Sequence, residues 1–159
     1  MTAYWLMKSE PQVYSLADLA REGETLWDGV RNYQARNFLR QMQVGDRVFF
    51  YHSNSRPPAI VGLARVRAVN IVDPSQFDPH SEYFEPRASV AQPRWWTVRV
   101  GFESQWSQPL SLATLKKTFA DSEFLLVKKG CRLSVLPVPL NIAEQILRAR
   151  ATEEPSRSP

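Results

Sequence analysis

The stretch that decides the fold is Leu26-Trp27-Asp28-Gly29-Val30-Arg31-Asn32-Tyr33-Gln34-Ala35-Arg36-Asn37-Phe38-Leu39. Its second half has the pattern of an amphipathic helix, because apolar residues recur at the i, i+3, i+4 and i+7 spacing of one buried face. These residues are Ala35, Phe38, Leu39 and Met42. Asn32 stands before them and is a favourable N-cap residue. The sequence therefore predicts a helix that begins after Asn32, ends near Met42 and packs one side against a core.

The residues before this helix favour a small polar site. Trp27, Gly29 and Arg31 precede the cap, and the first turn of a helix carries unpaired N–H groups and a partial positive charge. Arginine beside such amides attracts anions. We expect a pocket in which the indole of Trp27 is one flat wall. The alternative is that Trp27 is a core residue and that the arginines are solvated.

Composition narrows the class of protein. The chain has 159 residues, of which 43% are hydrophobic and 23% charged, as in an ordinary globular domain. Its net charge of +4 is compatible with a polyanionic partner. Cys131 is the only cysteine, which excludes an internal disulfide and favours a reducing compartment. Since no signal-peptide pattern or membrane-length apolar run is present, we expect a cytoplasmic monomer without membrane contact, nuclear if the source is eukaryotic.

The order of secondary-structure signals favours an α+β fold. Helix caps are predicted at Ser15, Ser111 and Asn141, the last in a variant of the capping box with Glu144. Apolar alternation and β-branched runs predict strands over residues 4–7, 47–51, 60–69, 95–103 and 133–137. This order lacks regular βαβ alternation, so we expect a strongly curved sheet or small open barrel with helices packed at its ends.

The chain reads as a single domain over residues 1–150, followed by a flexible tail over residues 151–159. Residues 70–94 form a long segment without helix or strand signals, and such loops are usually binding loops, lids or disordered inserts. Phe77, Tyr83 and Phe84 argue against disorder, because large aromatic side chains generally pack.

Several classes of chemistry lack support in the sequence. Only His52 and His80 could serve as histidine bases or ligands, and no Gly-x-Ser-x-Gly nucleophile motif is present. Two histidines and one cysteine do not reproduce a zinc spacing, and there is no GxGxxG or Walker loop. Cys131 is expected to be a small buried hydrophobe. We therefore predict no metal and no cofactor.

A binding site for a nucleobase fits the remaining polar residues. Trp27 can stack on a flat ring, while Lys8, Ser9 and Glu10 on one turn and His52 and Ser53 on another can hydrogen-bond its edge. Stacking on an aromatic side chain contributes about 1–3 kcal/mol per base, comparable to the cost of unstacking one. Five arginines could reach phosphates: Arg31, Arg36, Arg56, Arg65 and Arg87.

The chain resembles the EVE-domain family over nearly its whole length, up to about Ala149. The matching motifs are Tyr4-Trp5-Leu6-Met7-Lys8-Ser9-Glu10-Pro11, the run from Trp27 to Asn37, Gly45-Asp46, Phe49-Phe50-Tyr51-His52-Ser53, Ile60-Val61-Gly62, Asp73-Pro74-Ser75-Gln76-Phe77-Asp78-Pro79, Pro93-Arg94-Trp95 and Arg132-Leu133-Ser134-Val135. The family belongs to the PUA-like superfamily, with YTH and ASCH domains. The resemblance implies a pseudo-barrel sheet flanked by helices. It also implies recognition of modified bases, either 5-methylcytosine-type marks in DNA or modified RNA bases.

The resemblance also implies the residues of the base pocket. They are Lys8, Ser9, Glu10, Trp27, Val30, Arg31, Asn32, His52 and Ser53, with Arg36, Arg56, Arg65 and Arg87 left to contact the nucleic-acid backbone. One departure from the family pattern is Phe84-Glu85-Pro86-Arg87, where relatives often have Tyr-Asp-Pro-Lys. Charge is kept there, but a contact through the tyrosine hydroxyl would be lost.

Three functions stay open at this stage. The first is a non-catalytic reader that captures a modified base. The second is an enzyme acting on a nucleobase or nucleoside, with Glu10 or His52 as acid–base group. The third is a protein-interaction domain that uses residues 70–94.

Overall fold

The computed structural model describes residues 2–153, which form six strands, four α-helices and two short 3₁₀ helices. The strands are β1 (Tyr4–Ser9), β2 (Glu24–Leu26), β3 (Arg47–His52), β4 (Ala59–Val72), β5 (Trp96–Ser111) and β6 (Val135–Val138). The helices are α1 (Leu16–Glu22), α2 (Tyr33–Gln41), α3 (Leu112–Thr118) and α4 (Leu140–Glu153), and the 3₁₀ helices are η1 (Pro74–Phe77) and η2 (Leu125–Val127).

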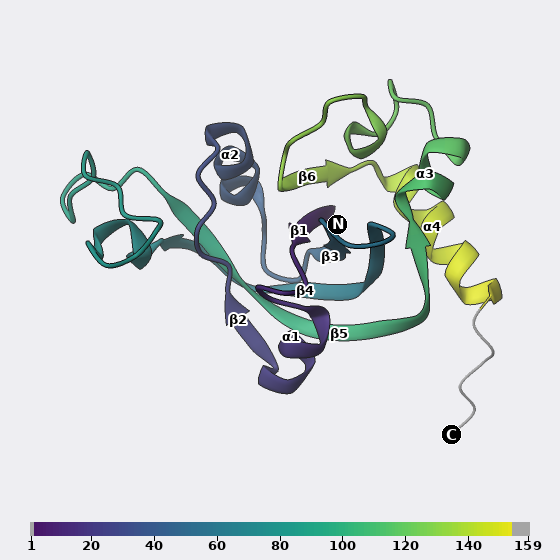
Figure 1. Ribbon diagram of the computed structural model, residues 1–159, viewed down its shortest axis with the longest axis horizontal. Coiled ribbons are helices and arrows are strands. Elements are labelled where there is room, and N and C mark those ends of the chain that lie inside the picture. The colour runs from purple at the N-terminus through teal and green to yellow at the C-terminus, as the bar shows by residue number, and fades with distance from the viewer. Residues whose placement is uncertain (1, 154–159) are drawn as a thin grey trace.

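All six strands belong to one mixed sheet in the order β2-β5-β4-β3-β1-β6. β1 pairs with β3 in parallel, and the other neighbours are antiparallel. The pairing of β4 with β5 shifts register at four places, and irregularities of this kind bend and twist a sheet. The two long strands sweep across the molecule from the loop that follows β4 to the end that carries α3 and α4 (Figure 1). The predicted α+β fold with a curved sheet and flanking helices is confirmed.

The central strands are buried on both faces and supply two cores. In β1, Trp5 and Met7 pack with α1 and α2, whereas Leu6 between them packs with α3, η2 and α4. Successive side chains of a strand point to opposite faces, so one strand serves both cores. β3 does the same, with Phe50 in the first core and Phe49 in the second. The cavity described below lies beside the core of α1 and α2.

Local signals predicted the starts of three helices correctly, including that of α3, which Ser111 caps through its hydroxyl. The side chain of Asn32 accepts a hydrogen bond from Ala35 N (2.9 Å) and caps α2. Ser15 caps α1 in a reciprocal capping box with Asp18. The predicted cap at Asn141 is wrong, because α4 already begins at Leu140 and Asn141 lies inside its first turn.

Other boundaries also differ from the sequence prediction: β1 and β4 extend to Ser9 and Val72, and β2 was not predicted. β5 continues to Ser111, eight residues beyond the predicted end at Glu103, because its polar second half still pairs with β4 up to Ala59. α4 runs to Glu153 and so includes the first three residues of the predicted tail; residues 154–159 of that tail lie outside the described part of the chain. Within residues 2–153, no helix has the length and apolar character needed to cross a bilayer.

Candidate functional site

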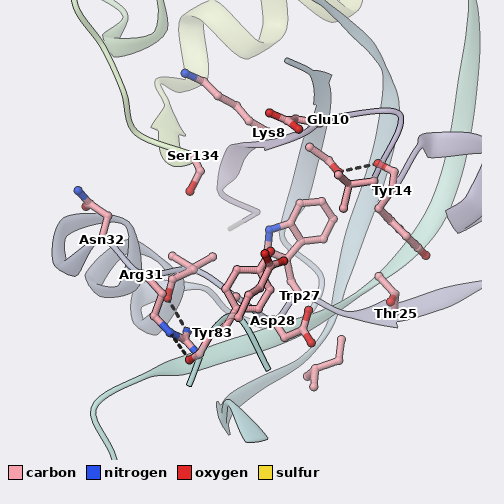
Figure 2. A pocket seen from close by; sticks show the side chains of 16 residues that line it. Lys8, Glu10, Tyr14, Thr25, Trp27, Asp28, Arg31, Asn32, Tyr83 and Ser134 are labelled. Carbon is pink, nitrogen blue, oxygen red and sulfur yellow. Dashed lines mark hydrogen bonds between the residues drawn. The ribbon is translucent and has the colours of Figure 1, made fainter. Parts of the chain in front are cut away.

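A cavity of about 750 Å³ opens between the ends of β1 and β2, the segment leading into α2, and the long loop after β4 (Figure 2). Its volume lies within the range of small-molecule sites in proteins. We call residues 73–95 of the long loop the strap. Seven of the nine predicted pocket residues line this cavity: Lys8, Ser9, Glu10, Trp27, Val30, Arg31 and Asn32. Six further polar or aromatic residues, which were not predicted from the sequence, also line it: Tyr14, Thr25, Asp28, Glu82, Tyr83 and Ser134.

Trp27 is held in the wall of the cavity by aromatic packing. Its ring lies edge-to-face against Phe50 (5.5 Å between centroids) and Tyr14 (6.5 Å), and its side chain is 8% exposed. Its backbone is paired with β5, since Trp27 N donates to Val98 O (3.0 Å) and Thr97 Oγ1 donates to Trp27 O. Trp27 is therefore a core residue that also borders the cavity.

Tyr83 is the more accessible aromatic ring of the cavity. It is half-buried, and its ring lies directly over Gly29. A Cβ atom at position 29 would stand 2.7 Å from that ring, so only glycine lets the strap approach this closely. The φ angle of Gly29 is +86°, which also favours glycine. Burial and the neighbouring Glu82 raise the pKa of Tyr83, so its hydroxyl stays protonated near neutral pH.

Arg31 ties the strap to the body of the domain. Its guanidinium donates to the Tyr83 carbonyl (2.7 and 3.0 Å), the Val30 carbonyl (2.8 Å), Asp73 Oδ2 (3.1 Å) and Ser75 Oγ (3.0 Å). These five hydrogen bonds match the five N–H donors of an arginine. All five donors of Arg31 are therefore engaged within the chain, and its contact with a ligand phosphate stays a prediction.

Asp73 is the acceptor at the centre of this network. It is 1% exposed and accepts from Gly29 N (2.9 Å), Arg31 Nη1, Ser75 N (2.8 Å) and Ser75 Oγ (2.6 Å). A buried carboxylate is stable only when it is paired and hydrogen-bonded, and this one is. Gln76, also fully buried, joins the two ends of the strap through its side-chain bonds to Asp73 O and to Arg94 N and Trp95 N.

The lining of the cavity carries charges of both signs, with an excess of carboxylates. Glu10, Asp28 and Glu82 line it together with Lys8 and Arg31. Burial and the nearby Asp73 raise the pKa of Asp28. Burial lowers the pKa of Lys8, whose amine lies 5.8 Å from the centre of the Tyr51 ring. Because Arg31 is paired with Asp73, Lys8 is the cation of the lining that has no carboxylate partner within residues 2–153.

His52 and Ser53 lie behind the cavity and do not line it. His52 Nε2 accepts from Leu16 N (3.1 Å) at the start of α1, and Ser53 N donates to Ser9 O (3.0 Å). Burial lowers the pKa of His52, which keeps its ring neutral as this hydrogen bond requires. The structure therefore does not bring these two residues together with the other seven, because the end of β3 directs them toward β1 and α1; base contacts by them stay a prediction. The Ser9 hydroxyl is also engaged, donating to Tyr14 O (2.5 Å).

The four arginines predicted to contact a nucleic-acid backbone have different surroundings. Arg65 is paired with Glu103 (2.7 Å), which Arg47 also contacts, and Arg87 is paired with Glu85 (3.1 Å). Those two are therefore engaged in internal ion pairs, and their contact with a nucleic-acid backbone stays a prediction. Arg36 and Arg56 form no ion pair within residues 2–153.

The residues that sequence reasoning missed come from segments far apart in the chain. Asp28 is adjacent to the predicted Trp27, so the motif could have indicated it, whereas Tyr14 lies four residues after Glu10. Tyr83 and Ser134 could not be placed, because their approach depends on how the strap folds back and on how β6 pairs with β1. Within residues 2–153, no cluster of three or more His, Cys, Asp or Glu residues could hold a metal ion.

Comparison with known proteins gives a consistent result. A family model described as EVE domain matches residues 3–149. Among curated proteins, thymocyte nuclear protein 1 of Danio rerio is 39% identical over 95% of this chain, and that of Homo sapiens is 39% identical over 73%. The matches cover 65% and 56% of those proteins, so the chain spans less than two thirds of their length.

Solved structures share the same architecture. A crystal structure of a protein from Pseudomonas putida is 47% identical, with a TM-score of 0.90, and covers 93% of this chain and 99% of its own. The crystal structure of human THYN1 protein in complex with 5-methylcytosine containing DNA is 34% identical, with a TM-score of 0.86. It covers 97% of this chain and 100% of its own.

Proposed function

This chain belongs to the EVE-domain family, and on that premise we propose that it is a non-catalytic reader that captures one modified base of a nucleic acid in the cavity beside Trp27. The human THYN1 complex supports this proposal, because it joins the same PUA-like fold to DNA that contains 5-methylcytosine. We propose a 5-methylcytosine-type base in DNA as the ligand, with a modified RNA base as the alternative.

The observation that carries the proposal is the cavity itself. It has an aromatic boundary at Trp27 and Tyr83, an apolar wall at Leu26 and Val30, and hydrogen-bonding groups around them. An extruded base needs such a combination, because its faces are apolar and its edge is polar. The apolar wall gives a methyl group on the ring a place to pack.

The charges of the lining favour a base over a phosphate inside the cavity. The carboxylates of Glu10, Asp28 and Glu82 repel an anion, and they can accept hydrogen bonds from an exocyclic amine. Cytosine and adenine carry such an amine, whereas thymine and uracil present a carbonyl at that position. Lys8 can donate to a ring acceptor of the same base. The arrangement therefore supports a cytosine-type ring within the cavity and phosphates outside it.

An enzyme would need an acid–base group within reach of the base, whereas a reader needs only hydrogen-bonding groups. His52, the histidine considered as an acid–base group, uses Nε2 to accept from Leu16 and lies outside the cavity lining. Glu10 lies at the rim and accepts from Asn54 Nδ2 (3.4 Å). We therefore propose that binding, without chemical change of the base, is the function.

The test is a binding titration with oligonucleotides that differ at one base. Fluorescence anisotropy at fixed salt compares cytosine with 5-methylcytosine in DNA and in RNA of the same sequence. A Ser134→Trp variant places a bulky ring at the mouth of the cavity while sparing the core, since Ser134 is half-buried and lies at the rim (Figure 2). Ala113→Trp on the exposed side of α3 is the control of equal size.

Wild type and Ala113→Trp should bind the modified oligonucleotide more tightly than the plain one, and Ser134→Trp should bind both equally. Thermal melting checks that all three proteins are folded. A folded Ser134→Trp protein that still discriminates would show that the base is read elsewhere. Mass spectrometry of the recovered oligonucleotide should show no change of mass; a change would favour an enzyme.

A further inference from the structure

A basic loop precedes β6 and ends two residues before Ser134, which lines the cavity. Lys128, Lys129 and Arg132 are exposed between η2 and β6, where Cys131 N donates to Lys128 O (3.1 Å) and closes a turn. None of the three forms an ion pair with a carboxylate within residues 2–153. Three positive charges within five residues therefore face solvent without compensation. We call residues 128–132 the basic loop.

Two observations connect the basic loop to the cavity. Ser134, two residues after the loop, lines the cavity, and its carbonyl accepts from Lys8 N (2.8 Å). Cys131 of the loop is close enough to Lys8 to oppose the lowering of its pKa by burial. Figure 2 shows Ser134 and Lys8 on the same side of the cavity. The loop thus borders the mouth on the side of β1 and β6.

A second group of cations without carboxylate partners lies next to the start of α2. Arg36 follows the lining residue Asn32 by one helical turn, and its Nη1 donates to Arg94 O (2.9 Å). Arg94 Nη1 lies 3.5 Å from the hydroxyl of Tyr33, the residue after Asn32. Neither arginine has a carboxylate partner within residues 2–153. We call Arg36 and Arg94 the arginine pair.

We propose that the basic loop and the arginine pair contact phosphates on opposite sides of the captured base, so that a nucleic-acid strand crosses the mouth from one to the other. This inference rests on the proposed function. Its physical basis is the change of sign at the mouth: carboxylates inside the cavity repel phosphates, and uncompensated cations outside attract them. Lysine and arginine that neutralise phosphates release counterions, so this contact has a measurable dependence on salt.

The test compares two double variants with the same loss of charge. Lys128→Gln/Lys129→Gln removes two cations from the basic loop, and Lys116→Gln/Lys117→Gln removes two exposed cations from α3, at the opposite end of the sheet from α2 (Figure 1). Affinity for a DNA duplex with one 5-methylcytosine is measured by anisotropy between 50 and 200 mM salt. A plain duplex of the same sequence is titrated in parallel.

The Lys128→Gln/Lys129→Gln variant should make the slope of log affinity against log salt shallower by about two units, since each phosphate contact contributes about 0.9. Affinity should then fall about tenfold less than in wild type between 50 and 200 mM salt. The α3 variant should keep the wild-type slope. An unchanged slope in the basic-loop variant, or an equal change in both variants, overturns the inference.

The two titrations separate this inference from the proposed function. Preference for the modified duplex over the plain one should be the same in wild type and in the basic-loop variant, because phosphate contacts do not read bases. If wild type shows no preference, the proposed function fails, while the slopes still show whether the basic loop contacts phosphates. If preference is present and the slope is unchanged, only the present inference fails.

Discussion

The two aromatic walls of the cavity are held in place by different forces. Trp27 is fixed by apolar packing against Phe50 and Tyr14 within a continuous core. Tyr83 belongs to the strap, which is held by the hydrogen bonds and ion pair of Arg31 and Asp73. Apolar packing has no directional requirement, whereas a buried polar network fails when one partner is removed. The cavity thus combines a wall that unfolds only with the domain and a wall that can be released separately.

The largest expected effect comes from the apolar wall. Trp27→Ala removes a side chain that is 8% exposed and should lower the free energy of unfolding by about 3–5 kcal/mol, because the core closes only partly around the lost indole. Urea denaturation measures this loss. Trp27→Phe keeps an aromatic ring in the core and should cost clearly less. Equal losses in the two variants would mean that packing does not hold this wall.

The polar wall should respond with local opening. Asp73→Ala leaves Arg31 and Gly29 N without their acceptor and should lower the free energy of unfolding by about 2–3 kcal/mol. This loss is smaller than that for breaking a fully buried ion pair, because Arg31 is partly exposed. Hydrogen exchange followed by mass spectrometry should speed up in residues 73–95 more than in the segment around Trp27. Asp78→Ala, at an exposed carboxylate of the strap, is the control. Uniform acceleration across the domain would show that the strap does not open by itself.

Adding a methyl group at Gly29 should disturb the Tyr83 wall without disturbing the Trp27 wall, at a smaller cost in stability. Gly29→Ala and Gly45→Ala both place a side chain at a φ near +90°, which costs about 1–2 kcal/mol. Only Gly29→Ala also meets the Tyr83 ring, since nothing lies within 4 Å of a Cβ at Gly45. Both variants should lose similar stability by thermal melting, and Gly29→Ala alone should weaken binding of the modified oligonucleotide. Wild-type binding by Gly29→Ala would remove Tyr83 from the proposed site.

Lowering the pH should reduce the free energy of unfolding through protonation of Glu85 in the strap, with almost no effect near neutral pH. Contacts from Arg87 and Trp95 Nε1 lower the pKa of this buried carboxyl to about 2, below its unfolded value near 4.5. The folded state therefore binds fewer protons than the unfolded state between these values, and the stabilisation is complete above pH 4.5 and lost toward pH 2. The difference in unfolding free energy between wild type and Glu85→Gln should narrow over this range. A difference that does not change with pH would contradict the assignment.

The sequence predicted one wall better than the other for a physical reason. The apolar stripe of α2, the Asn32 cap and the position of Trp27 follow from patterns within a few residues, and each was found. The strap depends on bonds between Arg31 and residues about 42–52 positions away, and no local pattern indicates which carboxylate an arginine will meet. The arginine was therefore assigned to a ligand. The same reason explains why His52 was expected in the site although its partner is an amide of α1.

The contact between Arg31 and Tyr83 has a consequence for how the family could diversify. Arg31 holds residue 83 by its main-chain oxygen, a group that all twenty amino acids provide. These two hydrogen bonds therefore set no requirement on the side chains at positions 82 and 83, although the Tyr83 ring adds a contact with the Arg31 guanidinium, 5.6 Å from its centre. A library randomised at these two positions should yield folded proteins with altered ligand preference, since Arg31 still holds the main chain at residue 83.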